Sequence, residues 1–424
     1  MCVTLLIGSL LVSQASAAPF VLADDEITLE GPNNLWVKTY NYSYEYTTVT
    51  ISRTSSGYII GGSCEGEYHD GLIVHVDTEG GVLFQTYVGG ESLDEIESIT
   101  QCQNGDFIAV GRTNSYSSNY SSTGYLWLMR LANNGTILWE NWYPDHFWGL
   151  SVAECQDGDL IVSGVHPHLV HLYSNGSVKW SKRYEEWDIS TAYGVVECNN
   201  GDFAFAGIAD TDPLGNIDYQ AWLVRTDTNG TLLWSETYGD NPFNAGRSLI
   251  QCSDGGFAII GETGADMYFP RSPWLIRTDE NGALLWNNTY SLGYGKSVVQ
   301  CADGGFGSAG TFTESGAYPS WDALFVRTDE DGNELWRSLC SGPNEDRGHS
   351  LVLTDSGQFV VAGWSLLDSS RSAFIWQLSD AYVTPTPTPT TYDIDVFEVI
   401  LVGSVFAGIF IVLVVIIGLR RNSP

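Results

Sequence analysis

The sequence predicts an all-β protein in which one structural unit is repeated. Its 424 residues include 46 Gly, 15 Trp, 22 Tyr and 17 Phe, a composition typical of many short strands joined by tight turns. A ten-residue segment also recurs almost unchanged, as RTDTNGTLLW at 225–234, RTDENGALLW at 277–286 and RTDEDGNELW at 327–336. Repetition of this kind indicates units that stack on one another.

The repeated unit is predicted to contain four antiparallel strands. In one copy, strand-like runs at 248–252 and 257–263 flank the turn SDGG, and runs at 274–279 and 283–290 flank the turn ENG. Counting outward from the ten-residue segment gives a unit of roughly 41 to 55 residues, which is in the range of propeller blades. A small sheet cannot bury both faces alone, so each unit must pack against its neighbours.

The number of repeated units follows from the recurrence of the aromatic residue that ends the ten-residue segment. It recurs at Phe84, Trp139, Trp180, Trp234, Trp286 and Trp336. A further set of inner strands near residues 351–376 has no such residue, but LWVKTY at 35–40 has the outer-strand pattern and provides Trp36. We therefore predict a seven-bladed β-propeller of four-stranded blades over residues 31–382, closed by this N-terminal strand, because closure removes exposed sheet edges.

The repeats resemble those of a known group of proteins. GDFIAVG at 105–111, GGFAIIG at 255–261 and WLIRTDENGALLW at 274–286 are similar to blades of secreted prokaryotic β-propeller proteins, which read approximately SDGGYIIAG and then YLIKTDxNGxxLW. The resemblance covers residues 31–382 and implies the fold but no particular activity.

The DxNGxxLW portion is also similar to the tryptophan-docking motif of pyrroloquinoline quinone propellers. That similarity implies that the aromatic residues pack between blades: Trp36, Phe84, Trp139, Trp180, Trp234, Trp286 and Trp336. It does not extend to the quinone, because those enzymes usually have eight blades and a vicinal Cys-Cys pair. We expect no cofactor.

The N-terminal residues resemble a secretion signal. Residues 3–12 form a short apolar run before Ala15-Ser16-Ala17, which is typical of a signal peptide over residues 1–17 that is cut after Ala17. Residues 18–30 then form a leader segment.

The C-terminal residues predict a membrane anchor. Val399 to Leu419 carry no charge and are long enough to cross a bilayer core of about 30 Å. Arg420 and Arg421 follow, so the positive-inside rule places this end in the cytoplasm. We expect a Pro/Thr-rich stalk, a transmembrane helix and a cytoplasmic tail, at residues 383–395, 396–419 and 420–424. The chain would then cross the cell membrane once, with the propeller outside the cell.

The net charge bears on the expected partners, and the sequons agree with an extracellular location. The net charge of -33 repels phosphate backbones, so nucleic acid is not an expected partner. Asn-x-Ser/Thr sequons occur at Asn41, Asn119, Asn134, Asn175, Asn229 and Asn287. Asn-Gly turns also select three of these residues without any glycan, so their weight is modest.

Two residue positions recur from blade to blade and are interpreted as structural. A basic residue occupies one register of the third strand, where a carboxylate nearby in the blade would pair with it: His75, Arg130, His171, Arg225, Arg277 and Arg327. A cysteine precedes the second strand at Cys102, Cys155, Cys198, Cys252 and Cys301. Buried, reduced thiols are the favoured interpretation, because the spacing between neighbouring blades is marginal for disulfides.

No motif predicts a metal site. The segment DTDPLGNID, with Asp210, Asp212 and Asp218, is similar to a calcium loop only loosely, because it lacks the D-x-D-x-D-G core and the distant Glu. A solvated loop is the alternative, so calcium is the one metal left open.

Two sets of residues are candidates for binding. Loops between the second and third strands and between blades vary in length and fall on one rim, where they carry Trp148, Trp187, Tyr268, Phe269 and Trp321. The inner strands begin with charged residues at the mouth of the predicted channel: Arg247, Lys296 and His349, with Glu97. Aromatic residues flanked by acids suit either ligand recognition or loop packing.

The sequence favours a binding function over catalysis. We interpret the chain as a membrane-anchored extracellular binding or adhesion module for a carbohydrate or a protein. The alternatives are a cell-surface enzyme (a hydrolase, lyase or quinone-type dehydrogenase) that uses the central channel, and a structural envelope protein. The charged residues at the channel mouth make no recognised catalytic pair, so enzymatic activity is not the favoured interpretation.

Overall fold

The described part of the chain consists of β-strands. The computed structural model describes residues 27–41, 49–65, 69–116, 124–144, 148–184, 190–212, 218–265, 271–314, 320–367 and 370–380. Secondary structure in these ranges is all β, as predicted, and none of it is a helix long and apolar enough to span a membrane. The predicted signal peptide, stalk, transmembrane helix and tail lie outside the described residues.

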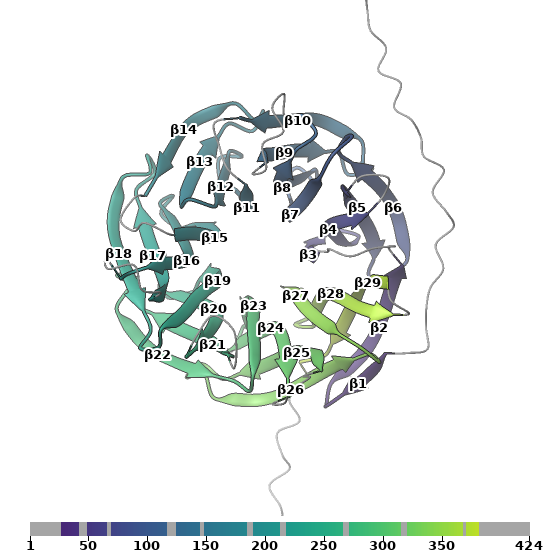
Figure 1. Cartoon of the computed structure of the whole chain (residues 1–424), viewed down its shortest axis with the longest axis vertical. Helices are drawn as coiled ribbons and strands as arrows, with labels where there is room; N and C mark the ends of the chain where they lie inside the picture. The colour runs from purple at the N-terminus through teal and green to yellow at the C-terminus, as the bar shows by residue number, and fades with distance from the viewer. Residues whose placement is uncertain are drawn as a thin grey trace, which may run out of the picture. The chain divides into compact units, whose positions relative to one another are not determined.

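The strands form four-stranded antiparallel sheets arranged in a ring (Figure 1). From the innermost strand outward, the first sheets are β3 (Val49–Thr54), β4 (Gly57–Glu65), β5 (His69–Asp77) and β6 (Val82–Val88); β7 (Asp94–Gln101), β8 (Phe107–Thr113), β9 (Tyr125–Leu131) and β10 (Ile137–Tyr143); and β11 (Gly149–Glu154), β12 (Leu160–Gly164), β13 (His168–Leu172) and β14 (Val178–Arg183).

The remaining sheets continue around the ring. They are β15 (Ser190–Glu197), β16 (Phe203–Asp210), β17 (Tyr219–Thr226) and β18 (Leu232–Tyr238); β19 (Phe243–Gln251), β20 (Phe257–Gly264), β21 (Arg271–Thr278) and β22 (Leu284–Thr289); β23 (Gly293–Gln300), β24 (Phe306–Thr313), β25 (Trp321–Thr328) and β26 (Glu334–Ser341); and β27 (Asp346–Leu353), β28 (Phe359–Leu367) and β29 (Ser370–Leu378). One parallel pairing, Tyr219 with Phe243, links the β15 and β19 sheets.

The N-terminal residues pair with two neighbouring sheets. Strand β2 (Asn34–Asn41) lies antiparallel to β29, in agreement with the outer-strand pattern of residues 35–40. Strand β1 (Thr28–Glu30) adds a fifth strand to the outer edge of β26. These three residues were predicted to belong to the leader segment at 18–30, and a strand so short has no alternation that the sequence could reveal.

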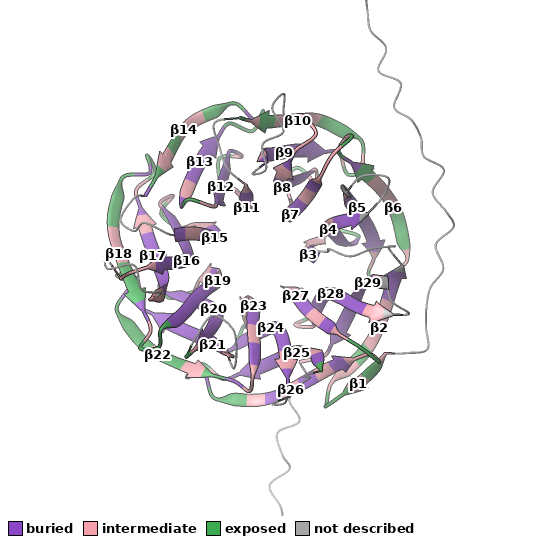
Figure 2. Ribbon diagram, in the orientation of Figure 1, coloured by how far each residue is buried: buried purple, intermediate pink, exposed green. Residues whose placement is uncertain are grey.

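The core lies between neighbouring sheets. One buried cluster joins Ala206 and Leu223 of the β15 sheet to Phe257 and Ile259 of the β19 sheet. The middle strands are covered on both faces and therefore read as continuous apolar runs. The outer strands carry exposed residues around the outer circumference of the ring (Figure 2).

The repeated ten-residue segment supplies a contact between sheets. In the turn Asp329-Glu330-Asp331-Gly332 before β26, Gly332 has a φ of +78°, and a Cβ added to it would lie 2.5 Å from the ring of Trp286 in the preceding sheet. The hydroxyl of Tyr290 donates a hydrogen bond to the carbonyl of the same Gly332 at 2.8 Å. Only glycine combines this φ with this close approach.

The same contact recurs around the ring. The outer-strand aromatic residue lies against the turn glycine of the next sheet in the pairs Trp36–Gly80, Phe84–Gly135, Trp139–Gly176, Trp180–Gly230, Trp234–Gly282 and Trp286–Gly332. Trp336 is buried in the cluster that also holds Leu29 of β1. The recurrence explains why the chain repeats the segment: each copy provides both a turn and a ring for docking.

The recurring basic and cysteine positions are structural. Arg277 and Arg327 each donate to a carboxylate in the neighbouring hairpin turn, Asp254 at 2.5 Å and Asp303 at 2.6 Å. Asp279, by contrast, caps its own turn by accepting hydrogen bonds from backbone amides. The five cysteines are buried, and no described cysteine forms a disulfide. Burial raises the thiol pKa, to about 12 for Cys102.

Candidate functional site

One residue in each of several inner strands is forced out of the sheet register. The pairing of β19 with β20 skips from Gly246 to Ser248, and that of β23 with β24 skips from Gly295 to Ser297. An extra residue of this kind is a β-bulge, a device that re-aims a side chain. The residues skipped in this way are Glu97, Leu150, Tyr193, Arg247, Lys296 and His349.

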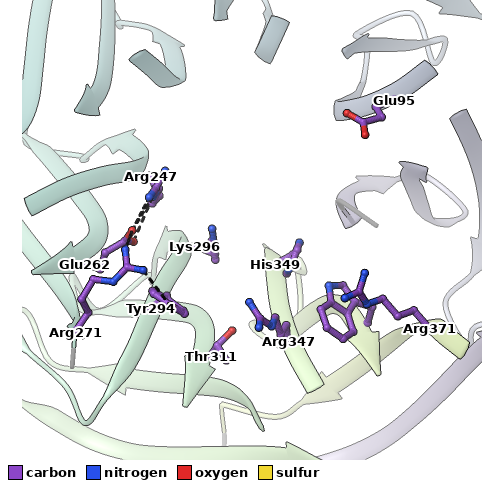
Figure 3. A pocket seen from close by; sticks show the side chains of 11 residues that line it. Glu95, Arg247, Glu262, Arg271, Tyr294, Lys296, Thr311, Arg347, His349 and Arg371 are labelled. Atoms are coloured by element: carbon purple, nitrogen blue, oxygen red, sulfur yellow. Dashed lines mark hydrogen bonds and ion pairs between the residues drawn. The ribbon is translucent and has the colours of Figure 1, made fainter. Parts of the chain in front are cut away.

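The skipped residues of three neighbouring sheets are basic and line one cavity. This cavity, of about 440 Å³, includes Arg247, Lys296 and His349 from neighbouring inner strands. Strands farther out contribute Arg271 of β21 and Arg371 of β29, and Arg347 lies on β27 itself. Figure 3 shows these side chains gathered along one side of the opening, with Glu95 across from them. We call this cavity the cationic pocket.

The cationic pocket concentrates scarce positive charge. It holds five of the 18 Lys and Arg residues of a chain whose net charge is -33. The acidic residues that line it are Glu262 and Glu95, and Arg112 pairs with Glu95. Positive charge at a concave site surrounded by an acidic surface focuses the local potential on an anion.

Glu262 holds two of the arginines. Its carboxylate is only 1% exposed and accepts hydrogen bonds from Arg247 Nε at 3.1 Å and Nη2 at 2.5 Å, and from Arg271 Nη1 at 3.2 Å. Burial alone would raise the pKa of Glu262, but the charge of Arg247 outweighs this effect and lowers it. One buried carboxylate therefore fixes two guanidinium groups that together exceed its charge.

Aromatic rings hold the other arginines. Arg347 lies over the rings of Trp321 and Trp364, at 4.8 and 5.4 Å, and Arg371 lies over Trp364 at 4.4 Å. Trp321 in turn stacks on Tyr294 with 5.3 Å between centroids. We call these alternating rings and guanidinium groups the arginine stack. Stacking fixes the plane of each guanidinium group.

Lys296 and His349 lie in a strongly positive environment. Burial and the neighbouring charge of Arg247 lower the pKa of Lys296 to about 8, although Glu262 opposes the shift. Burial, together with Lys296, Arg347 and Arg371, lowers the pKa of His349 to about 3. His349 is therefore neutral at physiological pH, and its Nδ1 accepts a hydrogen bond from the Val49 amide at 3.5 Å. That contact assigns its proton to Nε2, which can donate to a ligand.

The predicted binding residues separate into groups. Arg247, Lys296 and His349 come together in the cationic pocket. Trp321 is only 7% exposed and belongs to the arginine stack, so its ring packs rather than presenting an open face. Trp148 is half-buried with Arg112 over its ring at 3.9 Å. Trp187, Tyr268 and Phe269 lie outside the described residues.

Other lining residues were not predicted from the sequence, although a signal for several exists. Glu262, Thr311 and Trp364 each follow the glycine that pairs beside a β-bulge, at Gly261, Gly310 and Gly363. The glycine repeats while the next residue varies, a pattern expected where the backbone is constant and the side chain serves the site. Arg271 and Arg371 lie in the first two residues of third strands, after variable loops, and carry no comparable signal.

The aspartates of the possible calcium loop accept hydrogen bonds within the protein. Asp210 accepts hydrogen bonds from the amides of Asp212 and Asp218, at 3.3 and 3.4 Å. Asp218 accepts from Thr211 at 2.9 Å and from Gln220 at 2.7 Å. Among the described residues, no group of three or more His, Cys, Asp or Glu side chains is arranged to hold a metal ion.

Comparisons with known proteins show the fold. No protein-family model matches the chain, and no curated protein matches it. The WD40 β-propeller domain of Doa1 is similar with a TM-score of 0.51 at 12% identity, over 82% of this chain and 97% of that one. BamB from Moraxella catarrhalis is similar with a TM-score of 0.44 at 12% identity, over 84% of this chain and 100% of that one. A protein of unknown function from Bacteroides caccae is similar with a TM-score of 0.41 at 13% identity, over 62% of this chain and 94% of that one.

The ring of antiparallel sheets and the likeness to the Doa1 domain define a β-propeller. At this low identity the likeness concerns the fold alone, because propellers host many unrelated functions. Function must therefore be argued from the cationic pocket.

Proposed function

We propose that this protein is a closed seven-bladed β-propeller that binds an anionic ligand in the cationic pocket at the mouth of its central channel. The observation that carries the proposal is the run of three basic β-bulge residues, Arg247, Lys296 and His349, beside the arginine stack. A chain with few cations places five of them at one cavity, where mutual repulsion destabilises the empty site. A bound anion relieves that repulsion.

The size and chemistry of the cationic pocket favour a small carboxylate ligand. A cavity of about 440 Å³ accommodates an organic acid or an acidic sugar unit, and small-molecule sites are commonly about 300–1,000 Å³. Guanidinium groups bind carboxylates through paired N–H donors. Trp321 and Trp364 are 7% and 5% exposed, so they offer little open ring surface to a neutral sugar. An acidic carbohydrate therefore fits better than a neutral one.

The location and the seven-bladed count belong to the same proposal. The pairing of β2 with β29 supports closure of the ring by an N-terminal strand. The apolar residues 3–12 and 399–419, with the Thr/Pro repeat between the propeller and the second of these runs, support an extracellular propeller on a membrane-anchored stalk. In that arrangement the cationic pocket would meet acidic glycans or organic acids outside the cell.

A ligand panel tests the binding function. The full chain is incubated with uronic-acid oligosaccharides, citrate and matched neutral oligosaccharides, and the shift in thermal midpoint is measured for each. The proposal predicts a shift of several degrees for acidic ligands only. Arg347→Gln should abolish the shift, whereas Arg337→Gln, which changes an exposed arginine paired with Glu334, should retain it. Equal shifts with neutral sugars would refute the anion preference.

A further inference from the structure

Lys296 differs from the other basic residues of the cationic pocket. Arg247 and Arg271 are held by Glu262, and Arg347 stacks on Trp321 and Trp364. Lys296 makes no hydrogen bond or ion pair with any described residue, and it occupies the unpaired position of its β-bulge. Lys179, by comparison, forms ion pairs with Asp157 and Asp159. An amine that serves no structural contact is available for chemistry.

The surroundings of Lys296 raise the fraction of the neutral amine. Burial and the charge of Arg247 lower its pKa to about 8, so near that pH about half of the molecules carry an uncharged nitrogen lone pair. Free lysine, with a pKa of about 10.4, is almost entirely protonated under the same conditions. A desolvated lysine beside other cations is the arrangement that activates an amine as a nucleophile.

We propose that Lys296 forms a reversible imine with the carbonyl group of a small 2-oxo acid, whose carboxylate is held by the neighbouring arginines of the cationic pocket. This inference rests on the proposed anion-binding function and names the substrate class of the same site. The carboxylate and the carbonyl of a 2-oxo acid are adjacent. One ligand can therefore place its carboxylate against the guanidinium groups of Arg347 and Arg371 while presenting an electrophilic carbon to an amine that lines the same cavity.

The reaction balances without a further reactant. The lone pair of Lys296 Nζ attacks the carbonyl carbon, a C–N bond forms, and the carbonyl electron pair moves to oxygen. Both amine protons leave with that oxygen as one molecule of water, and a C=N bond remains. Water in the open pocket carries these protons. Hydrolysis reverses the sequence, so a mild reductant is needed only to trap the imine for detection.

Reductive trapping tests the inference directly. The full chain is incubated with pyruvate and cyanoborohydride at pH 8, and adducts are located by peptide mass spectrometry. The chain has four lysines, Lys38, Lys179, Lys182 and Lys296, so the other three serve as internal references. We expect adduct formation at Lys296 to be roughly 10- to 100-fold faster than at the references. Equal labelling of all four lysines, or none at Lys296, would overturn the inference.

Controls separate the imine from simple anion binding. Acetone, which has a carbonyl but no carboxylate, should label Lys296 about tenfold more slowly than pyruvate, because no group directs it to the arginines. Arg347→Gln should remove that preference for pyruvate. Lys296→Arg should lose the adduct at this position while the reference lysines still react slowly. Saturable citrate binding by the wild-type chain without any Lys296 adduct would leave the anion-binding function standing and refute the imine.

Discussion

Glu262 is the residue on which the cationic pocket depends most. Its carboxylate is 1% exposed and holds Arg247 and Arg271 together. Removing one member of a buried ionic group leaves the others without a counter-charge, which is more costly than losing an exposed pair. The same removal makes the cationic pocket more positive. Stability and ligand affinity should therefore change in opposite directions at this residue.

Glu262→Gln should lower the free energy of unfolding by about 3–5 kcal/mol and tighten citrate binding. Denaturant unfolding and calorimetry measure the two effects. Glu334→Gln is the matched control, because Glu334 pairs with the exposed Arg337, and such pairs contribute about 0–1 kcal/mol. A Glu262→Gln variant of unchanged stability, or one that binds citrate more weakly, would contradict the assigned role.

Asp346 gives the folded state a pH dependence that runs opposite to that of most carboxylates. Burial raises its pKa to about 6, against the opposing effect of a hydrogen bond from the Gly342 amide. The folded protein therefore binds a proton more tightly than the unfolded chain. The contribution of Asp346 to stability is fully present below its unfolded pKa, about 3.9, and is lost as the pH rises through about 6.

Asp346→Asn should remove this pH dependence. Asn244 occupies the corresponding place in the β19 sheet, where its Oδ1 accepts a hydrogen bond from Thr263 at 2.6 Å, so asparagine fits the local geometry. The free energy of unfolding of the variant, relative to that of the wild type, should be about 2–3 kcal/mol higher at pH 7.5 than at pH 4. Unfolding curves at the two pH values measure the difference. A stability difference that does not change with pH would show that the carboxyl group titrates normally.

At the scale of the element, the contact between a turn glycine and the preceding outer strand explains the repeated ten-residue segment. Gly332 and Gly158 both have a φ near +80°, at +78° and +85°. An added Cβ at Gly332 would meet the ring of Trp286 at 2.5 Å, whereas one at Gly158 would have nothing within 4 Å. The two positions therefore separate the cost of left-handed backbone from the cost of a blocked contact.

Gly158→Ala should lower the free energy of unfolding by about 1–2 kcal/mol through backbone strain alone. Gly332→Ala should lower the free energy of unfolding by that amount and by about 1–3 kcal/mol more, because the added methyl group displaces the ring of Trp286. Trp286→Ala removes the ring itself and should cost about 3–5 kcal/mol. Equal losses for the two glycine variants in denaturant unfolding would mean that the turn does not dock the ring.

At the scale of the whole molecule, the pairing of β2 with β29 joins residues from the two ends of the propeller. Deletion of residues 31–42 removes β2 and should leave the outer edge of β29 unpaired. Exposed edges favour aggregation, so we expect a large fall in the thermal midpoint together with loss of soluble protein. An unchanged thermal midpoint in the deletion variant would refute closure by the N-terminal strand.

The sequence predicted the propeller because its repeats encode local features. The turn of the ten-residue segment needs a glycine, and an apolar run such as 257–261 follows from strands buried on both faces. The basic residues Arg247 and Lys296 were recognisable because they interrupt a repeated pattern. Arg371 was not, because it lies near the start of β29, outside any repeated pattern, and reaches the cationic pocket through a side-chain contact with the ring of Trp364 on the paired strand β28.

The same limit explains Trp321, which the sequence analysis placed among the recognition loops. It is the first residue of β25 and lies between variable residues, so its neighbours in sequence say nothing of Tyr294 and Arg347, which contact its ring. A large aromatic residue near a rim is equally suited to contact a ligand or to hold an arginine. Only the three-dimensional arrangement assigns it to the arginine stack.

Calorimetric titration of the full chain with citrate tests the central claim, that the cationic pocket is an anion-binding site. We predict saturable binding of one citrate per chain in the wild type, weakening as salt is added because the attraction is electrostatic. Arg347→Gln should weaken it by about tenfold or more, which corresponds to about 1.4 kcal/mol. Arg337→Gln should bind as the wild type does. Absence of saturable binding in the wild type, or equal affinity in all three proteins, would contradict the account.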